Sequence, residues 1–333
     1  EDRVIVRTLA PGDAWPQVSQ TEVELLPERE RRLHAPDLHL VSIVEGSTLT
    51  GRCSCWWTRA PVLPGERVGA IGHFAVSDRS AGVALLTAAC DRLGAAGCTL
   101  AVGPMDGNTW RRYRFVTERG TEPPFFLEPD NPDDWPDDWR QAGFAPIASY
   151  SSALNEDLGR DDPRIASARA RLESAGVAIR SLEMSDADAD LRRMFVLSLG
   201  SFSRNFLYTP IDESEFMEQN RAVLPVVQPD LVLLAEREGE LTGFLFAVPD
   251  VLQQRRGRAI DTIVIKTVAV APGLGLAGLG SVLVASAHAT ARRLGFTRAI
   301  HALMHEQNVS QNISRRYARP IRRYQLFARR LAT

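Results

Sequence analysis

The residues with the clearest chemical potential form a glycine-rich segment, Thr267 to Ser281, in which a β-branched stretch runs into closely spaced glycines. After it, Val282, Leu283, Ala287 and Ala291 recur at helical spacing, so we expect a buried strand, a turn and then a helix. Glycines let backbone N–H groups approach an anion closely, and a helix N-terminus adds its positive end. The segment predicts a cradle for a pyrophosphate, although glycines that serve only tight packing would give the same pattern.

Two common nucleotide sites fit this segment poorly. A Rossmann dinucleotide site needs such a turn after the first strand of its unit, with an acidic residue about 20 residues further on. Here the turn follows the fourth expected strand of its unit, and it lacks the lysine of a P-loop. Both the nicotinamide and the ATP interpretations are therefore weakened.

The elements that must hold this turn recur in the same order along the chain. We expect strands at 3–9, 38–45, 49–59, 67–76 and 98–102 with helices at 15–33 and 82–93, and strands at 177–183, 231–236, 241–248, 260–271 and 298–304 with helices at 188–203, 212–223 and 277–294. Further strands are expected at 148–154 and 321–331. This repeated order favours a tandem duplication of one α/β unit. We place the first domain at residues 1–155, a linker at 156–176 and the second domain at 177–333.

The stretch Val270 to Gly280 resembles the coenzyme A loop of the GNAT-type N-acetyltransferase superfamily, in which a strand ending V-x-P is followed by Q/R-x-x-G-x-G/A. Gly278 and Gly280 stand at the two small positions, whereas Gly275 stands where the family has Gln or Arg. The first half looks like a degenerate copy of this unit, because the stretch Arg79 to Gly82, at the position of the loop, contains a single glycine. The whole chain resembles tandem-GNAT proteins, which implies a mixed α/β sheet fold with two tandem GNAT-like acyltransferase domains.

The resemblance implies that the C-terminal half binds acetyl-CoA or another acyl-CoA. Pantetheine would contact the backbone of Val268 and Val270, and the thioester would lie near Asn308, in a segment that looks like the family's N-x-S/A motif. The residues expected to bind the cofactor are Val268, Ala269, Val270, Gly275, Leu276, Ala277, Gly278, Leu279, Gly280, Ser281 and Asn308.

Amine acylation by direct attack on a thioester needs a base for the ammonium proton and an acid for the departing thiolate. Tyr317 is the candidate acid, because it ends the expected helix after Asn308, and Tyr324 is the second choice. Either tyrosine is equally consistent with a structural aromatic. Glu306 is a candidate base, with histidines at 301 and 305 beside it, although satisfied or exposed histidines are the simpler interpretation. The nucleophile signatures Ser/His/Asp and Cys/His are not found, which favours direct transfer.

The leading functional hypothesis is acyl transfer, most simply of an acetyl group, to the amine of a small molecule. A second hypothesis is a non-catalytic module that binds acyl-CoA as a structural or sensory ligand. A third is an acyltransferase whose partner is a carrier-protein thioester or an aminoacyl-tRNA. The sequence does not name the acceptor, the acyl chain or the oligomeric state.

Composition places the chain among ordinary globular proteins, with 333 residues, 44% hydrophobic, 24% charged and a formal net charge of −2. It has no run of about 18 apolar residues and no signal-like N-terminus, so we expect no membrane span and a cytoplasmic location. The near-neutral charge argues against nucleic acid as a partner. The four cysteines lack metal-ligand spacing, so we expect buried thiols and no metal.

The small net charge hides two opposite segments. Carboxylates crowd the stretch Glu118 to Asp138, and arginines crowd the stretch Arg292 to Arg330. Solvated faces, or packing of one domain against the other, would explain both segments. The alternative is a basic rim that receives an anionic ligand such as a nucleotide phosphate.

Overall fold

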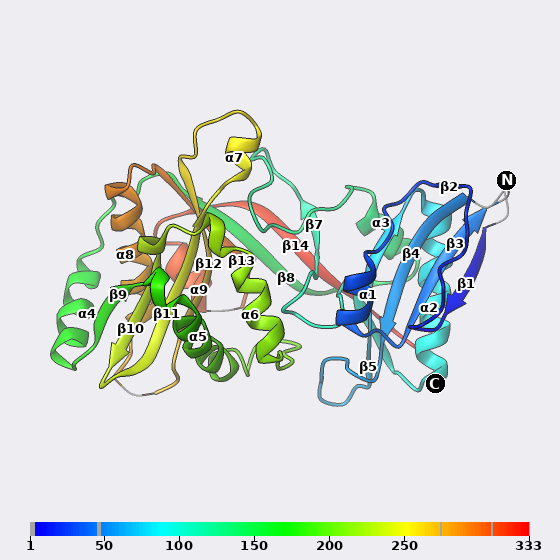
Figure 1. Cartoon of the computed structure of the whole chain (residues 1–333), viewed down its shortest axis with the longest axis horizontal. Coiled ribbons are helices and arrows are strands. Elements are labelled where there is room, and N and C mark those ends of the chain that lie inside the picture. The colour runs from blue at the N-terminus through cyan, green and yellow to red at the C-terminus, as the bar shows by residue number, and fades with distance from the viewer. Residues whose placement is uncertain (1–3, 45–47, 274, 308, 333) are drawn as a thin grey trace.

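The structure is a computed structural model of the chain and describes residues 4–44, 48–273, 275–307 and 309–332. Two halves of similar make-up lie end to end, the first in blue and cyan and the second in green to orange (Figure 1). Within the described residues the strands form one 14-stranded mixed sheet, with helices packed on its faces.

The first half contains, in chain order, β1 (Ile5–Leu9), β2 (Gln20–Thr21), α1 (Glu28–His34), β3 (Leu38–Val44), β4 (Thr48–Trp56), β5 (Val68–Val76), α2 (Arg79–Ala95), β6 (Leu100–Gly103), β7 (Phe115–Glu118), α3 (Trp135–Gln141) and β8 (Ala145–Asn155). The second half contains α4 (Pro163–Ser174), β9 (Ala178–Ser181), α5 (Ala187–Ser201), α6 (Glu213–Arg221), β10 (Val232–Arg237), β11 (Glu240–Pro249), α7 (Leu252–Arg255), β12 (Thr262–Val270), α8 (Leu279–Arg293), β13 (Arg298–His305), α9 (Val309–Ser314) and β14 (Arg319–Arg330). Short 3₁₀ helices occur at Met184–Asp186, Leu224–Val226 and Pro229–Leu231.

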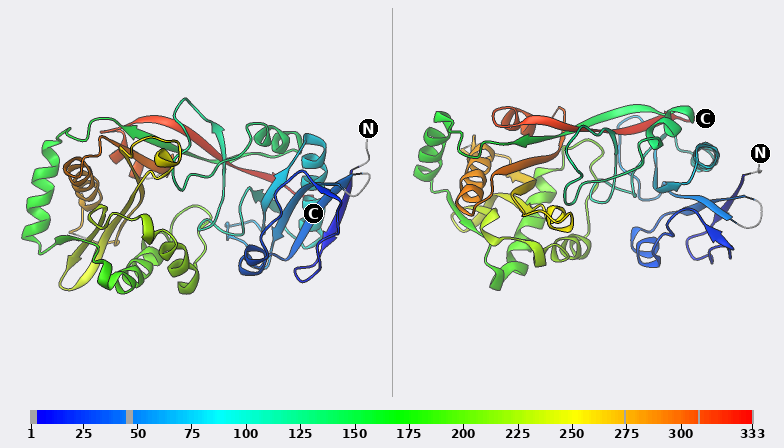
Figure 2. Two further views of the ribbon diagram at one scale, coloured as in Figure 1. Left: turned by 45° about the horizontal axis from the view of Figure 1, so that its top comes forward. Right: turned by 90° about the horizontal axis from the view of Figure 1, so that it is seen from above.

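The strand order is β1-β3-β4-β5-β6-β14-β8-β13-β12-β11-β10-β9, so each half contributes a strand to the other. The C-terminal strand β14 pairs with β6 of the first half, and β8 of the first half pairs with β13 of the second. These two exchanged strands lie antiparallel at the centre, with Tyr324 opposite Tyr150, and run across the molecule from one half to the other (Figure 2). The exchange makes the halves one continuous sheet.

Alternate residues of β12 show how the second half is layered. Ile263 and Ile265 pack in a core with α8 and α4, whereas Val264 and Ala269 pack in a separate core with α5 and α6. Because successive strand residues point to opposite faces, α8 and α4 cover one face of the sheet and α5 and α6 cover the other. In the first half, α2 packs on β3, β4 and β5 in a corresponding way.

Two expected elements differ from the structure. The helix expected at 15–33 is wrong for most of its length, since only Glu28–His34 is helical and Gln20–Thr21 is a short strand. Pro16 and Pro27 explain this, because proline lacks a backbone N–H and disfavours helical geometry in the residue before it. The helix expected to reach Tyr317 ends at Ser314, and Tyr317 lies in the turn before β14.

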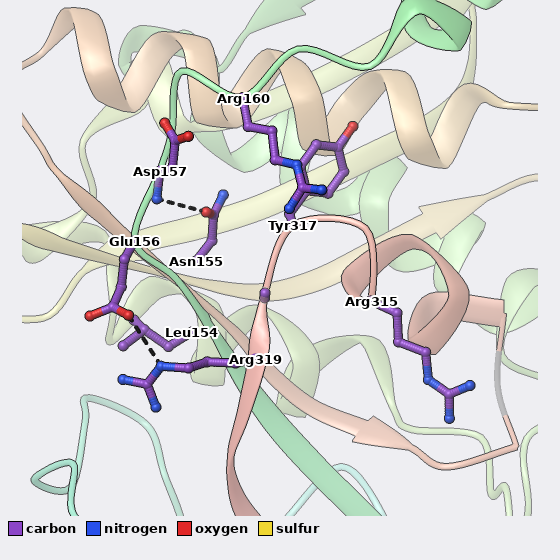
Figure 3. Close-up of a pocket in the computed structure, with 9 residues that line it drawn as sticks. Leu154, Asn155, Glu156, Asp157, Arg160, Arg315, Tyr317 and Arg319 are labelled. Atoms are coloured by element: carbon purple, nitrogen blue, oxygen red, sulfur yellow. Dashed lines mark hydrogen bonds and ion pairs between the residues drawn. The ribbon is translucent and has the colours of Figure 1, made fainter.

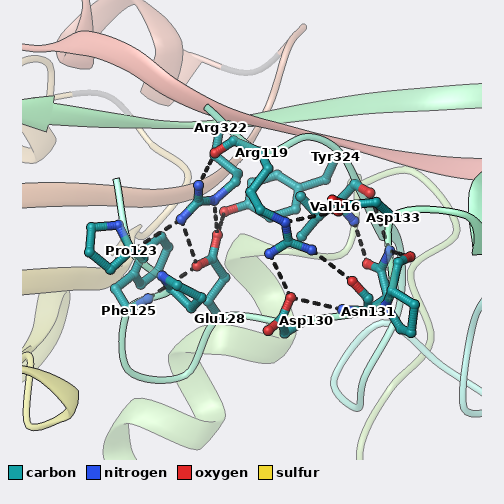
Figure 4. Close-up of polar contacts among 12 residues, drawn as sticks. Val116, Arg119, Pro123, Phe125, Glu128, Asp130, Asn131, Asp133, Arg322 and Tyr324 are labelled. Atoms are coloured by element: carbon teal, nitrogen blue, oxygen red, sulfur yellow. Dashed lines mark hydrogen bonds and ion pairs between the residues drawn. The ribbon is translucent and has the colours of Figure 1, made fainter. Parts of the chain in front are cut away.

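The acidic and basic segments meet each other, as Figure 4 shows for part of the contact. Arg322 Nε lies 2.7 Å from Glu128 Oε1, and both side chains are almost fully buried. Glu122 pairs with Arg298 at 2.7 Å and with Arg319 at 3.3 Å. These contacts favour the interpretation in which the opposite charges pack one half against the other.

Two further expectations concern the helices and the cysteines. Among the residues described, no helix combines the length and the apolar character needed to cross a bilayer. Cys53, Cys55, Cys90 and Cys98 are buried free thiols.

Candidate active site

The glycine-rich turn leads from β12 into α8 and leaves the start of that helix open. Gly278, the N-cap residue, has φ +87°, and Gly275 has φ +92°, backbone conformations that favour glycine. Val282 N–H donates to Gly278 O at 2.9 Å, so the amides of Gly280 and Ser281 precede the first helical hydrogen bond. No side chain of the described residues caps this helix. The turn therefore presents backbone donors at the positive end of α8.

Strands β12 and β13 separate before β12 reaches this turn. Their parallel pairing runs from Thr262 opposite Arg298 to Ile265 opposite His301 and then ends. Beyond that point, in the part of the chain that the structure describes, β12 pairs with β11 alone and β13 pairs with β8. We call the place after Ile265 and His301 the fork.

Strand register shows which backbone groups face the fork. Ala271 N–H donates to Thr242 O of the β11 side at 2.8 Å. Because hydrogen bonding alternates along an antiparallel pair, the amides of Val268 and Val270 point away from β11 and toward the fork. These are the two residues whose backbone the resemblance to the coenzyme A loop implies for pantetheine.

Two arginines from other elements flank the turn. Arg171 of α4 donates to Ala277 O at 2.6 Å, and its guanidinium is 3.4 Å from the position of a Cβ on Gly278. Arg237, at the end of β10, lies 3.5 Å from the position of a Cβ on Gly275. Gly275 itself has no side chain to offer a ligand, and these arginines supply positive charge along the turn, Arg237 beside Gly275 and Arg171 beside Gly278. Sequence reasoning missed both, because each lies far along the chain from the turn.

The corresponding places in the first half are occupied by the chain itself. Asp78 is the N-cap residue of α2, and its carboxylate accepts the Ala81 N–H at 3.0 Å. Beside β5, Asp106 Oδ1 accepts the His73 N–H at 2.6 Å, and a Cβ on Gly72 would lie 2.2 Å from Met105 O. In the first half, carboxylates thus accept hydrogen bonds from backbone N–H groups at the helix start and the strand edge. The corresponding N–H groups of the second half remain available to a ligand.

Lys266 stands at the fork, and it is the only lysine of the chain. The partners of Phe246 and Ala247 on β12 are Thr267 and Ile265, so Lys266 is the extra residue of a β-bulge. Its Nζ donates to Leu127 O at 3.3 Å. Burial, with a smaller contribution from the nearby Arg114 guanidinium, lowers the pKa of Lys266 from 10.5 to about 7. A neutral amine is therefore accessible at this position near neutral pH.

Tyr317 lies on the α8 face of the sheet. Its ring meets His288 edge-on at 5.1 Å, and its hydroxyl is buried without a hydrogen-bond partner in the described parts of the chain. Burial, with a contribution from Asp162, raises the pKa of Tyr317 above its usual value. It lines a surface pocket of about 410 Å³ with Arg160 and Arg315 (Figure 3).

Tyr324 lies in a different environment at the centre of β14. It is fully buried, its hydroxyl donates to Glu128, and it is 3.0 Å from Ser152 Oγ. Burial and the Glu128 carboxylate raise the pKa of Tyr324 strongly. Figure 4 shows this phenol beside the buried Arg322 and Glu128 pair.

The candidate bases proposed from the sequence also lie in environments that differ from one another. Glu306 is exposed just after β13, 3.8 Å from Arg323. His301 is buried and bonded to His288 at 2.9 Å and to Ser314 at 2.9 Å, and burial lowers its pKa to about 3. His305 is half-buried against Tyr150.

The structure brings together only part of the expected set. The strand and turn residues from Val268 to Gly273 and from Gly275 to Ser281 form one region, with Leu276 and Leu279 buried beneath it. Tyr317 and Tyr324 lie in separate environments. Asn308 and Leu274 lie outside the described residues.

Comparison with known proteins gives one curated relative and several similar structures. No protein-family model matches the sequence. A protein named bacterial ceramide synthase, from Caulobacter vibrioides, is 26% identical over 231 residues, which are 68% of this chain and 60% of that protein. This chain thus matches less than two thirds of the relative's length.

Two solved structures resemble the whole arrangement. A fungal multi-domain β-N-acetylglucosaminidase with a GCN5-related glucosamine N-acetyltransferase region aligns with 99% of this chain and 38% of its own, at a TM-score of 0.55 and 14% identity. A GCN5-related N-acetyltransferase from Sphaerobacter thermophilus aligns with 89% of this chain and 81% of its own, at a TM-score of 0.50 and 11% identity. The chain therefore has the mixed α/β fold of the GCN5-related N-acetyltransferases, and this fold occurs in it twice.

Proposed function

We propose that this protein transfers an acyl group from a coenzyme A thioester to an amine, and that only its C-terminal half binds the thioester. The observation that carries the proposal is the fork between β12 and β13 beside the open N-terminus of α8. A helix end of this kind suits a bound diphosphate, and a free strand edge suits an extended amide chain such as pantetheine. The second half has both features in one place.

The residues of the turn suit the cofactor in chemistry and in charge. The amides of Gly280 and Ser281 would donate to the diphosphate, and Arg171 and Arg237 would balance its charge. The amides of Val268 and Val270 would pair with pantetheine. A cofactor bound in this way would have its thioester at the fork, close to Lys266.

We propose Lys266 as the base, in place of the candidates Glu306, His301 and His305. The amine nitrogen forms a bond to the thioester carbonyl carbon, and the carbon–sulfur bond breaks. The amine proton passes to the neutral Lys266 Nζ, and the thiolate takes a proton from an acid or from water. Tyr317 stays the candidate for that acid, with Tyr324 as the alternative.

The acceptor is proposed to be a small-molecule amine. The curated relative's name adds a more specific candidate, because a ceramide is an amide formed between a fatty acyl group and a long-chain amino alcohol. Apolar side chains cluster on the α5 and α6 side of the sheet near Lys266, among them Trp110, Leu127, Phe202 and Leu303. Their apolar character favours acceptors or acyl chains with a substantial hydrocarbon part.

The test measures release of free coenzyme A thiol from acyl-CoA esters of increasing chain length. Acceptors are short amines, amino sugars and long-chain amino alcohols, each with and without the protein. We expect acceptor-dependent release with at least one pair. Tight acyl-CoA binding without turnover would assign a binding module instead, and turnover only with an acyl carrier protein thioester would assign the carrier-dependent alternative.

A further inference from the structure

Three side chains with metal-ligating atoms converge in the first half, away from the fork. Glu30 and His34 stand one turn apart on α1, so they share a face of that helix. His73 comes from the bulge of β5, where its φ is +49°. One ring nitrogen of each histidine and one carboxylate oxygen of Glu30 lie within 4.8 Å of one another.

The two imidazoles already face each other through the nitrogens that a metal would use. His34 Nδ1 lies 2.7 Å from His73 Nε2, and the rings stack with centroids 4.9 Å apart. Imidazole nitrogens are common ligands of transition-metal ions, so this face-to-face arrangement places two ligand atoms close together.

A hydrogen bond behind His73 orients its ring, and another hydrogen bond holds the backbone of His34. His73 Nδ1 is 2.9 Å from Ser54 Oγ, which is also 2.7 Å from His39 Nδ1. Trp56 Nε1 donates to the backbone carbonyl of His34 at 2.8 Å and so fixes the end of α1. Such outer hydrogen bonds set which nitrogen of a ligating histidine faces a metal.

Exposure decreases across the cluster from solvent to core. Glu30 is exposed, His34 is partly buried and His73 is 5% exposed. A cation would thus reach the cluster from the Glu30 side, where water completes its coordination. The positive charge of the nearby Arg111 is paired with Glu215 at 2.6 Å, and the buried Asp106 lies beside His73.

The second half offers a histidine pair for comparison. His288 and His301 lie 2.9 Å apart and stack at 5.1 Å, much as His34 and His73 do. Both are buried, and among the described residues no carboxylate joins them in a metal-sized cluster. The carboxylate and the open side therefore distinguish the first-half cluster from a purely structural pair.

We propose that Glu30, His34 and His73 bind one divalent transition-metal ion of the zinc class. Two imidazole nitrogens and one carboxylate are a donor set that suits Zn²⁺ and leaves one position for water. Binding would displace the proton of the hydrogen bond between the two imidazoles, and that proton would pass to the other nitrogen of its ring or to water. The ion would tie α1 to β5 at a place where Arg111 also contacts the second half.

The test uses the full chain, stripped with a chelator and titrated with Zn²⁺ and, separately, with Co²⁺. We expect one ion per chain by elemental analysis, and visible absorption of Co²⁺ typical of mixed nitrogen and oxygen ligands. Failure to bind Zn²⁺ stoichiometrically would overturn the proposal.

Variants then locate the ion. His34→Gln should weaken Zn²⁺ binding by at least about 100-fold, since even changes behind the ligands cost about 10–100-fold. Glu30→Gln should weaken it by about tenfold or more, while Glu28→Gln, with the same charge change on the same helix, should leave it unchanged. Circular dichroism checks that each variant is folded. Unchanged affinity in both His34→Gln and Glu30→Gln would place the ion elsewhere and contradict the assignment.

Discussion

Asp106 Oδ1 accepts the backbone N–H of His73 at 2.6 Å, on the edge of β5 that corresponds to the fork-facing edge of β12. In the first half, an internal carboxylate thus takes a donor that we propose for pantetheine in the second half. Asp78 likewise caps α2, whereas the described residues provide no such cap for α8. The two copies of the fold therefore differ in their capacity to hold an anionic, amide-rich cofactor.

The first prediction is that one coenzyme A binds per chain, in the second half. Gly280→Arg should abolish binding, because the side chain would fill the space of the diphosphate at the start of α8. Ser80→Arg is the matched control, since Ser80 holds the same position in α2 and is exposed. Titration calorimetry measures both. Loss of binding in Ser80→Arg with normal binding in Gly280→Arg would move the cofactor to the first half.

The second prediction concerns the arginines beside the turn. Arg237→Gln and Arg171→Gln should each weaken coenzyme A binding by about tenfold, or about 1.4 kcal/mol, because each removes a cation next to the diphosphate. The effect should shrink at high salt. Arg164→Gln provides the control on α4, because Arg164 pairs with Asp162. Equal coenzyme A affinities in all three variants would show that neither Arg237 nor Arg171 contributes to binding of the diphosphate.

The third prediction concerns Lys266 as the base. Lys266→Met should lower kcat by about 10²- to 10⁴-fold, the usual contribution of a positioned base. In the wild type, kcat/KM should rise with pH and reach half its maximum near pH 7, because the neutral amine is the active form and its pKa is about 7. If kcat/KM of Lys266→Met still rises with pH near pH 7, the base is another group.

The same lysine also makes stability depend on pH. Its folded pKa of about 7 lies below its ordinary value of 10.5, so between these values the unfolded chain binds more protons. The free energy of unfolding should therefore gain a contribution from Lys266 that increases from pH 7 to 10. Urea melts of wild type and Lys266→Met measure the difference, which should grow in favour of the wild type over this window.

The fourth prediction separates the two tyrosines. Tyr324→Phe removes a buried hydroxyl bonded to Glu128 and should destabilise the fold by about 1–3 kcal/mol. Tyr317→Phe should leave stability unchanged, because the described residues give its hydroxyl no partner. If Tyr317 is the acid, kcat should fall by about 10²- to 10⁴-fold with acyl-CoA binding intact. Unchanged turnover in both variants would remove tyrosine from the mechanism.

The fifth prediction concerns the ion pair beneath the exchanged strands. Glu128→Gln leaves the Arg322 guanidinium buried without its counter-charge, so the free energy of unfolding should fall by about 3–5 kcal/mol. Glu118→Gln breaks an exposed pair with Arg323 and should cost less than about 1 kcal/mol. Denaturant melts compare them. Similar small losses in both would show that the buried pair does not hold the halves together.

Local patterns in the sequence were enough to find the repeated fold. The β-branched run before Pro272 and the glycines after it predict a strand, a turn and a helix, which the structure contains as β12 and α8. The resemblance of this segment to a coenzyme A loop led to the GNAT fold, which the similar structures confirm. Such inferences succeed because strand, turn and helix preferences act over a few neighbouring residues.

The sequence by itself thus determined the turn, the duplicated order of elements and the oppositely charged segments. Only the tertiary structure decided that β8 and β14 change halves, that Lys266 stands at the fork and that Glu30 and His34 meet His73. The physical reason is that these relationships join residues far apart in the chain. Strand pairing depends on which sheet edge is free, and a pKa depends on burial. The spacing of residues along one segment determines neither property.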